Sequence, residues 1–101
     1  MTPPRITIKY CPKCNWMLRA SWMGQEILSS FSDDIEGVLL YPENEAPGVF
    51  EISIDKTIVW ERKTDGGFPG ASELKKRIRD IISPDRDLGH HDKPQTESKS
   101  C

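Results

Sequence analysis

The stretch R-I-T-I-K-Y-C-P-K-C-N-W, Arg5 to Trp16, decides the fold of this 101-residue chain and raises its main functional question. Its first half alternates apolar and polar side chains, which predicts a strand over Arg5–Tyr10. Pro12 ends that strand and can open a helix, because its missing N–H would have no partner at the first helical position anyway. Cys11 and Cys14 are therefore expected at a strand-to-helix corner.

Beyond this corner, apolar residues recur at steps of three and four positions and predict a helix over residues 13–31. The predicted buried face consists of Trp16, Ala20, Met23, Ile27 and Phe31. Serines and aspartates then end the helix.

The rest of the chain predicts three more strands and a second helix. The strands are expected at residues 35–41, 49–54 and 57–62. The first of them contains Val38-Leu39-Leu40, a short apolar run that suits a buried strand. The other two are separated by Asp55-Lys56, a two-residue hairpin connection. After a glycine-rich loop, apolar residues at helical spacing predict a helix from Ala71 to Ile82.

The predicted order is β-α-β-β-β-α. A helix between two strands makes a right-handed parallel unit, and the hairpin adds antiparallel strands. We therefore expect an α/β protein of the α+β type, with a mixed four-stranded sheet covered by helices. Residues 1–84 are expected to form one domain. Residues 85–101 are almost entirely polar and are expected to be a mostly mobile tail.

The composition limits the classes of function that the protein is expected to have. The chain is 36% hydrophobic and 30% charged with a net charge of −2, which argues against non-specific binding to nucleic acid or membranes. No stretch resembles a signal peptide or reaches transmembrane length, so we expect a cytoplasmic protein. In that compartment a close cysteine pair is more often catalytic or metal-binding than part of a disulfide scaffold.

Three interpretations of the Cys11–Cys14 pair compete. A redox centre is favoured because a helix N-terminus, Lys9 and Lys13 would each stabilise a thiolate, the reactive form. A structural zinc site needs four ligands. The remaining candidates, His90, His91 and Cys101, all lie in the polar tail. Two buried, inert thiols are the third interpretation. No cofactor-binding motif is present, and we expect neither a cofactor nor a metal.

Several motifs, taken in order, resemble the selenoprotein W-like proteins, the SelT/SelW/SelH (Rdx) family. The matching segments are Y-C-P-K-C-N-W-M-L-R-A-S-W at 10–22, G-V-F-E-I-S-I at 48–54, V-W-E-R-K at 59–63, D-G-G-F-P at 65–69 and G-H-H-D at 89–92. The resemblance covers roughly residues 5 to 92. It implies a thioredoxin-like fold and a redox role, with glutathione or protein thiols as partners.

The resemblance leaves the roles of the two cysteines open. In selenoprotein W the second position of the motif, here Cys14, is selenocysteine, which points to Cys14 as the more reactive atom. In thioredoxins, by contrast, the first cysteine of the pair attacks the substrate, and on that basis we expect Cys11 to be the more exposed of the two.

Thioredoxins also hold a cis-proline against their cysteine pair. Pro47, just before a predicted strand, is the candidate for that place.

The predicted site has two catalytic residues and five supporting ones. Cys11 and Cys14 are expected to react, and the supporting residues are Pro12, Lys13, Trp16, Pro47 and Phe68. Trp16 could equally be core packing, and the glycines before Phe68 could serve only to make a turn. Arg19 and Lys13 could receive an acidic group of a partner or lie on a solvated helix face.

Two functions are therefore expected. The first is a small thiol–disulfide oxidoreductase or redox adaptor that uses the cysteine pair. The alternative is a non-catalytic protein-interaction module whose cysteines only sense redox state. In that case an exposed aromatic surface near Trp16, Trp22 and Phe68 would bind the partner. The sequence assigns no role to the histidines or Cys101 and predicts no oligomeric state.

Overall fold

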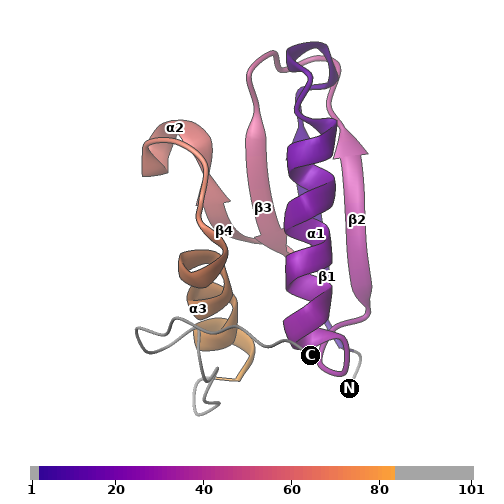
Figure 1. The fold of residues 1–101 in the computed structure, drawn as a ribbon, viewed down its shortest axis with the longest axis vertical. Helices are drawn as coiled ribbons and strands as arrows, with labels where there is room; N and C mark the ends of the chain where they lie inside the picture. The colour runs from indigo at the N-terminus through magenta and orange to yellow at the C-terminus, as the bar shows by residue number, and fades with distance from the viewer. Residues whose placement is uncertain (1–2, 84–101) are drawn as a thin grey trace.

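The computed structural model describes residues 3–83, which form a four-stranded mixed sheet with helices packed against it (Figure 1). The strands are β1 (Arg5–Tyr10), β2 (Gly37–Pro42), β3 (Phe50–Ile54) and β4 (Thr57–Glu61), in the spatial order β2-β1-β3-β4. Strand β1 pairs parallel with β2 and antiparallel with β3, and β3 pairs antiparallel with β4. The predicted mixed sheet is confirmed.

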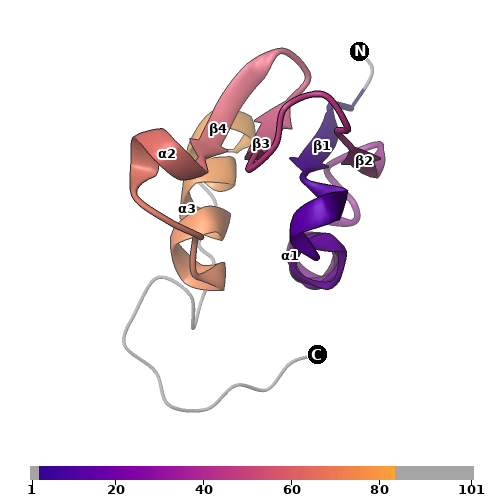
Figure 2. The ribbon, with the colours of Figure 1, turned by 90° about the horizontal axis from the view of Figure 1, so that it is seen from above.

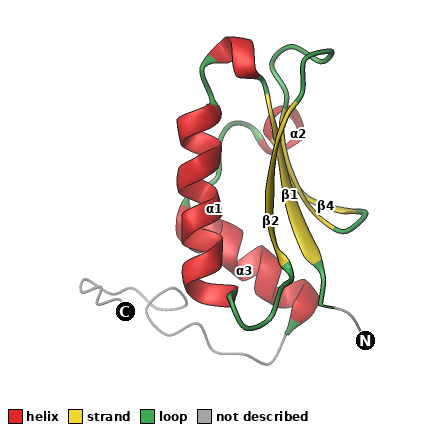
Figure 3. Cartoon of the chain, turned by 90° about the vertical axis from the view of Figure 1, so that its right-hand side faces the viewer, coloured by secondary structure: helices red, strands yellow, loops and turns green. Residues whose placement is uncertain are grey.

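Four helical segments accompany the strands, two between β1 and β2 and two after β4. They are the 3-10 turn η1 (Pro12–Cys14) and the helices α1 (Met17–Phe31), α2 (Arg62–Asp65) and α3 (Ala71–Ile82). Helices α1 and α3 lie on the same side of the sheet, so the molecule has two layers (Figures 2 and 3). The core lies between these layers, and α3 has the bounds that the sequence predicts. Helix α2 is an element that the sequence analysis did not predict.

The alternation in β1 is the one expected from the sequence. Ile6 and Ile8 are fully buried and Tyr10 is 7% exposed, while Arg5 is exposed. Their partners across β3 on the helix side are equally buried: Phe50, Ile52 and Ile54. The facing residues of the helices complete the core, and they are Ala20, Met23, Ile27, Phe31, Leu74 and Ile78. Burial of this apolar surface drives the two layers together.

The prediction that the second strand is buried is wrong. Strand β2 is an edge strand, and none of its residues is fully buried. Val38 and Leu40 pack against the core, whereas Leu39 and Tyr41 are 40% and 44% exposed. An apolar run alone does not distinguish a central strand from an edge strand, because only the pairing partners decide its position.

Strand β4 contains an irregularity that buries two consecutive residues. Its register with β3 shifts between Ile52 and Ser53, so that Ile52 pairs with Trp60 and Ser53 with Ile58. Val59 is therefore the extra residue of a β-bulge. Both Val59 and Trp60 are 7% exposed as a result. The predicted two-residue connection Asp55-Lys56 is confirmed, with Asp55 at a positive φ of 52°.

Two further expectations concern membrane-spanning segments and the C-terminal tail. Within residues 3–83, no helix has the length and apolar character that crossing a membrane requires. The predicted polar tail, with His90, His91 and Cys101, lies outside the described residues. Its mobility and the proposed domain boundary at residue 84 stay predictions.

Gly24 lies in α1 where the helix meets β2. A Cβ atom there would be 3.4 Å from Val38 Cγ1 and 3.6 Å from Leu40 Cδ2, which are ordinary van der Waals contacts. Gly24→Ala should therefore raise the free energy of unfolding by about 0.5–1 kcal/mol, because alanine is the better helix former. Urea denaturation followed by circular dichroism measures this change.

The matched control is Gly66→Ala. Gly66 ends α2 with a φ of +83°, and nothing lies within 4 Å of its ideal Cβ. The left-handed backbone alone should then lower the stability by about 1 kcal/mol. A destabilised Gly24→Ala protein would show that α1 and β2 have no room for a methyl group between them.

Candidate functional site

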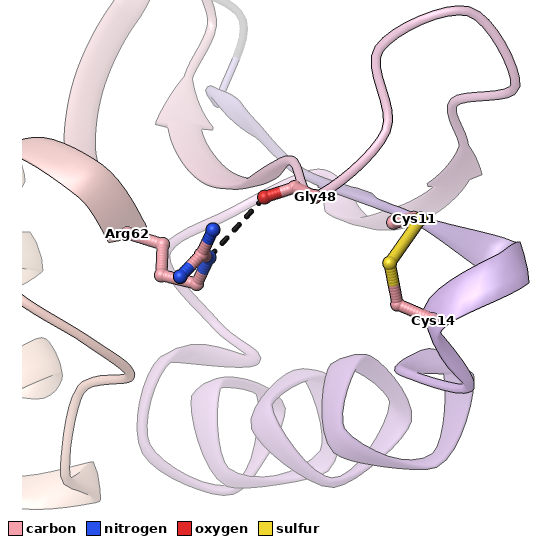
Figure 4. The surroundings of a disulfide bond; sticks show 4 residues. All are labelled: Cys11, Cys14, Gly48 and Arg62. Carbon is pink, nitrogen blue, oxygen red and sulfur yellow. Dashed lines mark hydrogen bonds between the residues drawn. A yellow bond between two sulfur atoms is a disulfide. The ribbon is translucent and has the colours of Figure 1, made fainter.

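The two cysteines occupy a tight turn at the end of β1. Cys11 follows the strand and precedes η1, and Cys14 is the last residue of that turn. The Cys14 N–H donates to the Cys11 carbonyl at 3.3 Å, and the Asn15 N–H donates to the Pro12 carbonyl at 3.2 Å. The Cα atoms of the two cysteines are 5.3 Å apart, and their sulfur atoms form a disulfide (Figure 4). That Cα separation lies within the range that disulfides require.

The long helix begins later than the sequence predicts. Pro12 opens η1, as expected, but the turn ends at Asn15, whose φ of 62° and ψ of 38° are left-handed. Trp16 then caps α1, which begins at Met17. The prediction that Cys14 lies in the first turn of the long helix is therefore wrong. An asparagine can adopt the left-handed conformation at low cost, which lets the chain reset its direction between the two helical segments.

The two cysteines differ in exposure. Cys11 is only 2% exposed, whereas Cys14 is half-buried. The expectation that Cys11 is the more exposed residue is wrong. Cys11 continues the extended backbone of an inner strand that has neighbours on both sides. The Glu43 N–H also donates to the Tyr10 carbonyl at 2.8 Å, so the chain is still paired directly before Cys11. Cys14 lies one turn further out, where solvent reaches it.

Trp16, Phe50 and Phe68 form an aromatic cluster beside the cysteine turn. The ring of Phe68 lies 5.0 Å from Trp16 and 4.9 Å from Phe50, and Trp16 lies 6.3 Å from Phe50, all edge to face. Such edge-to-face contacts are favourable beyond the burial of area. The structure thus brings together two predicted supporting residues, Trp16 and Phe68. Trp16 is also partly buried against the core, so it both contributes to core packing and lies beside the site.

Two arginines cover the aromatic cluster. The guanidinium of Arg19 lies 4.1 Å from the ring centre of Phe68, and that of Arg62 lies 5.1 Å from Trp16. Arg62 Nε also donates to the Gly48 carbonyl at 3.2 Å (Figure 4). Sequence reasoning considered Arg19 but missed Arg62, which it took for the last residue of a strand. No local pattern identifies Arg62, because its position follows from the way α2 folds back after β4.

A polar network holds the loop that carries Phe68. The Trp60 Nε1–H donates to the Gly67 carbonyl at 2.8 Å. Arg77 stacks over Trp60 at 4.4 Å and donates at 3.0 Å to both the Val59 carbonyl and Asp65 Oδ1. These bonds tie α3, β4 and the glycine loop together. The hydrogen bonds of Trp60 and Arg77 therefore fix the loop from which Phe68 packs against Trp16.

The ionised form of Asp65 is favoured by this network. Hydrogen bonding from the Glu61 backbone N–H, and then from Arg77, holds the pKa of Asp65 below its ordinary value of 3.8. The pKa of Glu61 is likewise lowered, chiefly by the Thr64 backbone N–H. Both carboxylates therefore support the fold in their charged form.

The remaining predicted residues lie around the turn without joining the cluster. Lys13 is exposed between the cysteines. Pro47 is exposed in the loop before β3, and none of the described peptide bonds is cis. Pro47 therefore does not reproduce a thioredoxin cis-proline. Leu18 and Trp22, on the outer face of α1, are 75% and 46% exposed. Residues 3–83 contain no group of three or more side chains that could hold a metal ion.

A family model described as the Rdx family matches residues 5–80. The chain belongs to the Rdx family. The crystal structures that resemble this Rdx protein include two bacterial ones. A selenoprotein W-related protein from Vibrio cholerae is 48% identical with a TM-score of 0.75, over 81% of this chain and 100% of that one. A protein from Bordetella parapertussis is 50% identical with a TM-score of 0.72, over 77% and 96% of the two chains.

Curated relatives are more distant and longer. Migration and invasion enhancer 1 from Bos taurus is 29% identical over 75 residues, which are 74% of this chain and 62% of the relative. The protein of the same name from Mus musculus is 28% identical over 74 residues, covering 73% and 61%. The Rdx chain thus spans about three-fifths of the length of these relatives. The family and its fold relate the chain to thioredoxin-like redox proteins.

Asp65→Asn tests the network behind Phe68. Because the folded-state pKa of Asp65 is lowered, its contribution is full at pH above its unfolded value near 3.8 and is lost as the pH falls through the folded value. The variant should be less stable than the parent at pH 7, and the difference should close below about pH 3.8. Urea denaturation across pH measures it.

Glu45→Gln removes an exposed loop carboxylate and serves as the control. It should leave the stability unchanged at pH 7. A stability gap between the Asp65→Asn protein and its parent that persists undiminished in acid would contradict the assigned role of the charge.

Proposed function

We propose that this Rdx protein is a thiol–disulfide oxidoreductase in which Cys14 attacks and Cys11 resolves. The observation that carries the proposal is the asymmetry of the pair. Cys11 is buried at the end of an inner strand, Cys14 is only half-buried, and their sulfur atoms are within bonding distance. The resemblance to selenoprotein W, which implies a selenocysteine at the position of Cys14, supports this order.

The reaction begins from the reduced pair. The Cys14 thiolate attacks one sulfur of a substrate disulfide, forming a Cys14–substrate bond while the other substrate sulfur leaves as a thiolate. The Cys11 thiolate then attacks Cys14 Sγ, which closes the Cys11–Cys14 disulfide and releases the second substrate thiolate. Two electrons have passed from the protein to the substrate. The two protons come from the protein thiols and pass to the departing thiolates by way of solvent.

Return to the dithiol needs a thiol reductant, and glutathione or protein thiols are the proposed class. The cytoplasmic location that the sequence predicts would supply both. The backbone hydrogen bonds of η1 keep the sulfurs in reach of each other, and Pro12 pre-sets the backbone of that turn. Exposed Lys13 adds a positive charge next to Cys14, which favours the thiolate.

Trapping distinguishes the two cysteines. The proposal predicts that Cys11→Ser forms stable mixed disulfides through Cys14, because the resolving sulfur is gone. Cys14→Ser should form them at least about tenfold more slowly, because the sulfur that remains is buried. Both variants are made in a Cys101→Ser background, which removes the third thiol of the chain. Non-reducing electrophoresis and mass spectrometry of the adducts give the measurement.

The double variant Cys11→Ser, Cys14→Ser is the control and should form no adduct. Equal trapping by the two single variants would contradict the assigned order. If neither variant traps a partner and the parent reduces no disulfide, the oxidoreductase proposal fails.

The exposed apolar residues of α1 favour a second candidate, a non-catalytic interaction module. Leu18 is the most exposed large apolar side chain among the described residues, and Trp22 lies one helical turn beyond it. Under this alternative, protein partners recovered with the parent would also be recovered with the double cysteine variant. Under the leading proposal they would be lost with it.

A further inference from the structure

We propose that Arg19 and Arg62 make this site selective for disulfides that carry a carboxylate close to the reacting sulfur. This inference rests on the proposed thiol–disulfide exchange and names its substrate class.

The other three arginines within residues 3–83 each form an ion pair with a carboxylate. Arg5 pairs with Glu36 at 3.2 Å, Arg77 with Asp65 at 3.0 Å, and Arg79 with Asp80 at 3.3 Å. Within residues 3–83, no acidic side chain pairs with Arg19 or Arg62. These two guanidiniums instead stack on the aromatic cluster beside the cysteines. Their charge is therefore available to an incoming group.

The two arginines are also held in place. Arg62 is half-buried, rests on Trp16 and uses Nε to bond the Gly48 carbonyl, which leaves its terminal N–H groups outside that contact. Arg19 lies on α1, where its guanidinium is close to the ring of Phe68. A guanidinium fixed on an aromatic face loses little freedom when it binds, and its planar fork fits a carboxylate.

The aromatic cluster connects these cations to the reacting sulfur. Trp16 follows Cys14 by two residues and contacts both Phe68 and Arg62. In Figure 4 Gly48 lies between Arg62 and the cysteine turn, and the Arg62 side chain bonds the Gly48 carbonyl. A substrate whose disulfide reaches Cys14 thus meets positive charge on the aromatic surface beside that sulfur.

The carboxylate takes no part in bond making. It would form a charge-assisted hydrogen bond with one or both guanidiniums while Cys14 attacks, and it would leave with the product thiolate. The electrons still come from the protein dithiol, so a single turnover needs no other reductant. A charge-assisted contact of this kind accelerates exchange by roughly tenfold when the transition state keeps it.

The test compares single-turnover rates of the reduced protein, in the Cys101→Ser background, with three small disulfides. Dithiodiglycolate carries carboxylates, hydroxyethyl disulfide is neutral, and cystamine is cationic. Each rate is divided by the rate of the same disulfide with a free small dithiol, which removes intrinsic reactivity. The normalised rate should be highest for the carboxylate, by about tenfold over the neutral compound, and lowest for the cation.

The variants Arg19→Gln and Arg62→Gln should each reduce the ratio of carboxylate to neutral rates, and together they should remove most of the preference, leaving only the part that Lys13 supplies. Lys56→Gln, in the β3–β4 turn at the opposite end of the sheet, removes the same charge and should leave the ratio unchanged. The ratio is the readout because substitution near the thiolate also alters the rate with every substrate.

Two further substrates distinguish the sources of the carboxylate. Glutathione disulfide represents the small thiols, and a cysteine peptide with flanking glutamates represents proteins. The one whose normalised rate falls more in the double arginine variant identifies the source. A parent protein with no preference for carboxylates, or a preference that both substitutions leave undiminished, would overturn the inference alone. Failure to reduce even the neutral disulfide would overturn the proposed function as well.

Discussion

Trp16 packs edge to face against both Phe50 and Phe68, and this contact joins three parts of the molecule that lie far apart in sequence. Trp16 belongs to the start of α1, Phe50 to β3, and Phe68 to the loop after α2. Since Cys14 precedes Trp16 by only two residues, the position of the aromatic ring restricts where that sulfur can lie. The surroundings of the cysteine pair therefore depend on this contact.

Sheet topology supplies the second constraint. Strand β1 has neighbours on both sides, so the residue that follows it is screened from solvent, and that residue is Cys11. The 3-10 turn then carries the chain outward to Cys14. A pair with one buried and one accessible sulfur suits exchange, because the substrate meets one thiol while the other is kept for resolution. The fold thus places two chemically identical side chains in different surroundings.

Local patterns in the sequence predicted the four strands and the two long helices, but not helix α2 and not which strands are neighbours in the sheet. Alternation identified β1, and helical spacing identified α3, because burial on one face imposes both periods. The edge position of β2 and the late start of α1 depend on pairing partners and on the left-handed Asn15, which no periodicity encodes. The spacing of Cys11 and Cys14 alone was enough to identify the cysteine pair. The position of Arg62 beside the site could not be predicted, since only the tertiary fold brings Arg62 there.

The central claim is that the fold exposes Cys14 and buries Cys11, and alkylation of the reduced protein tests it most directly. In the Cys101→Ser background, brief treatment with limiting iodoacetamide followed by peptide mass spectrometry gives the rate at each cysteine. The account predicts that Cys14 is alkylated at least about tenfold faster than Cys11. Equal rates, or faster alkylation of Cys11, would contradict it.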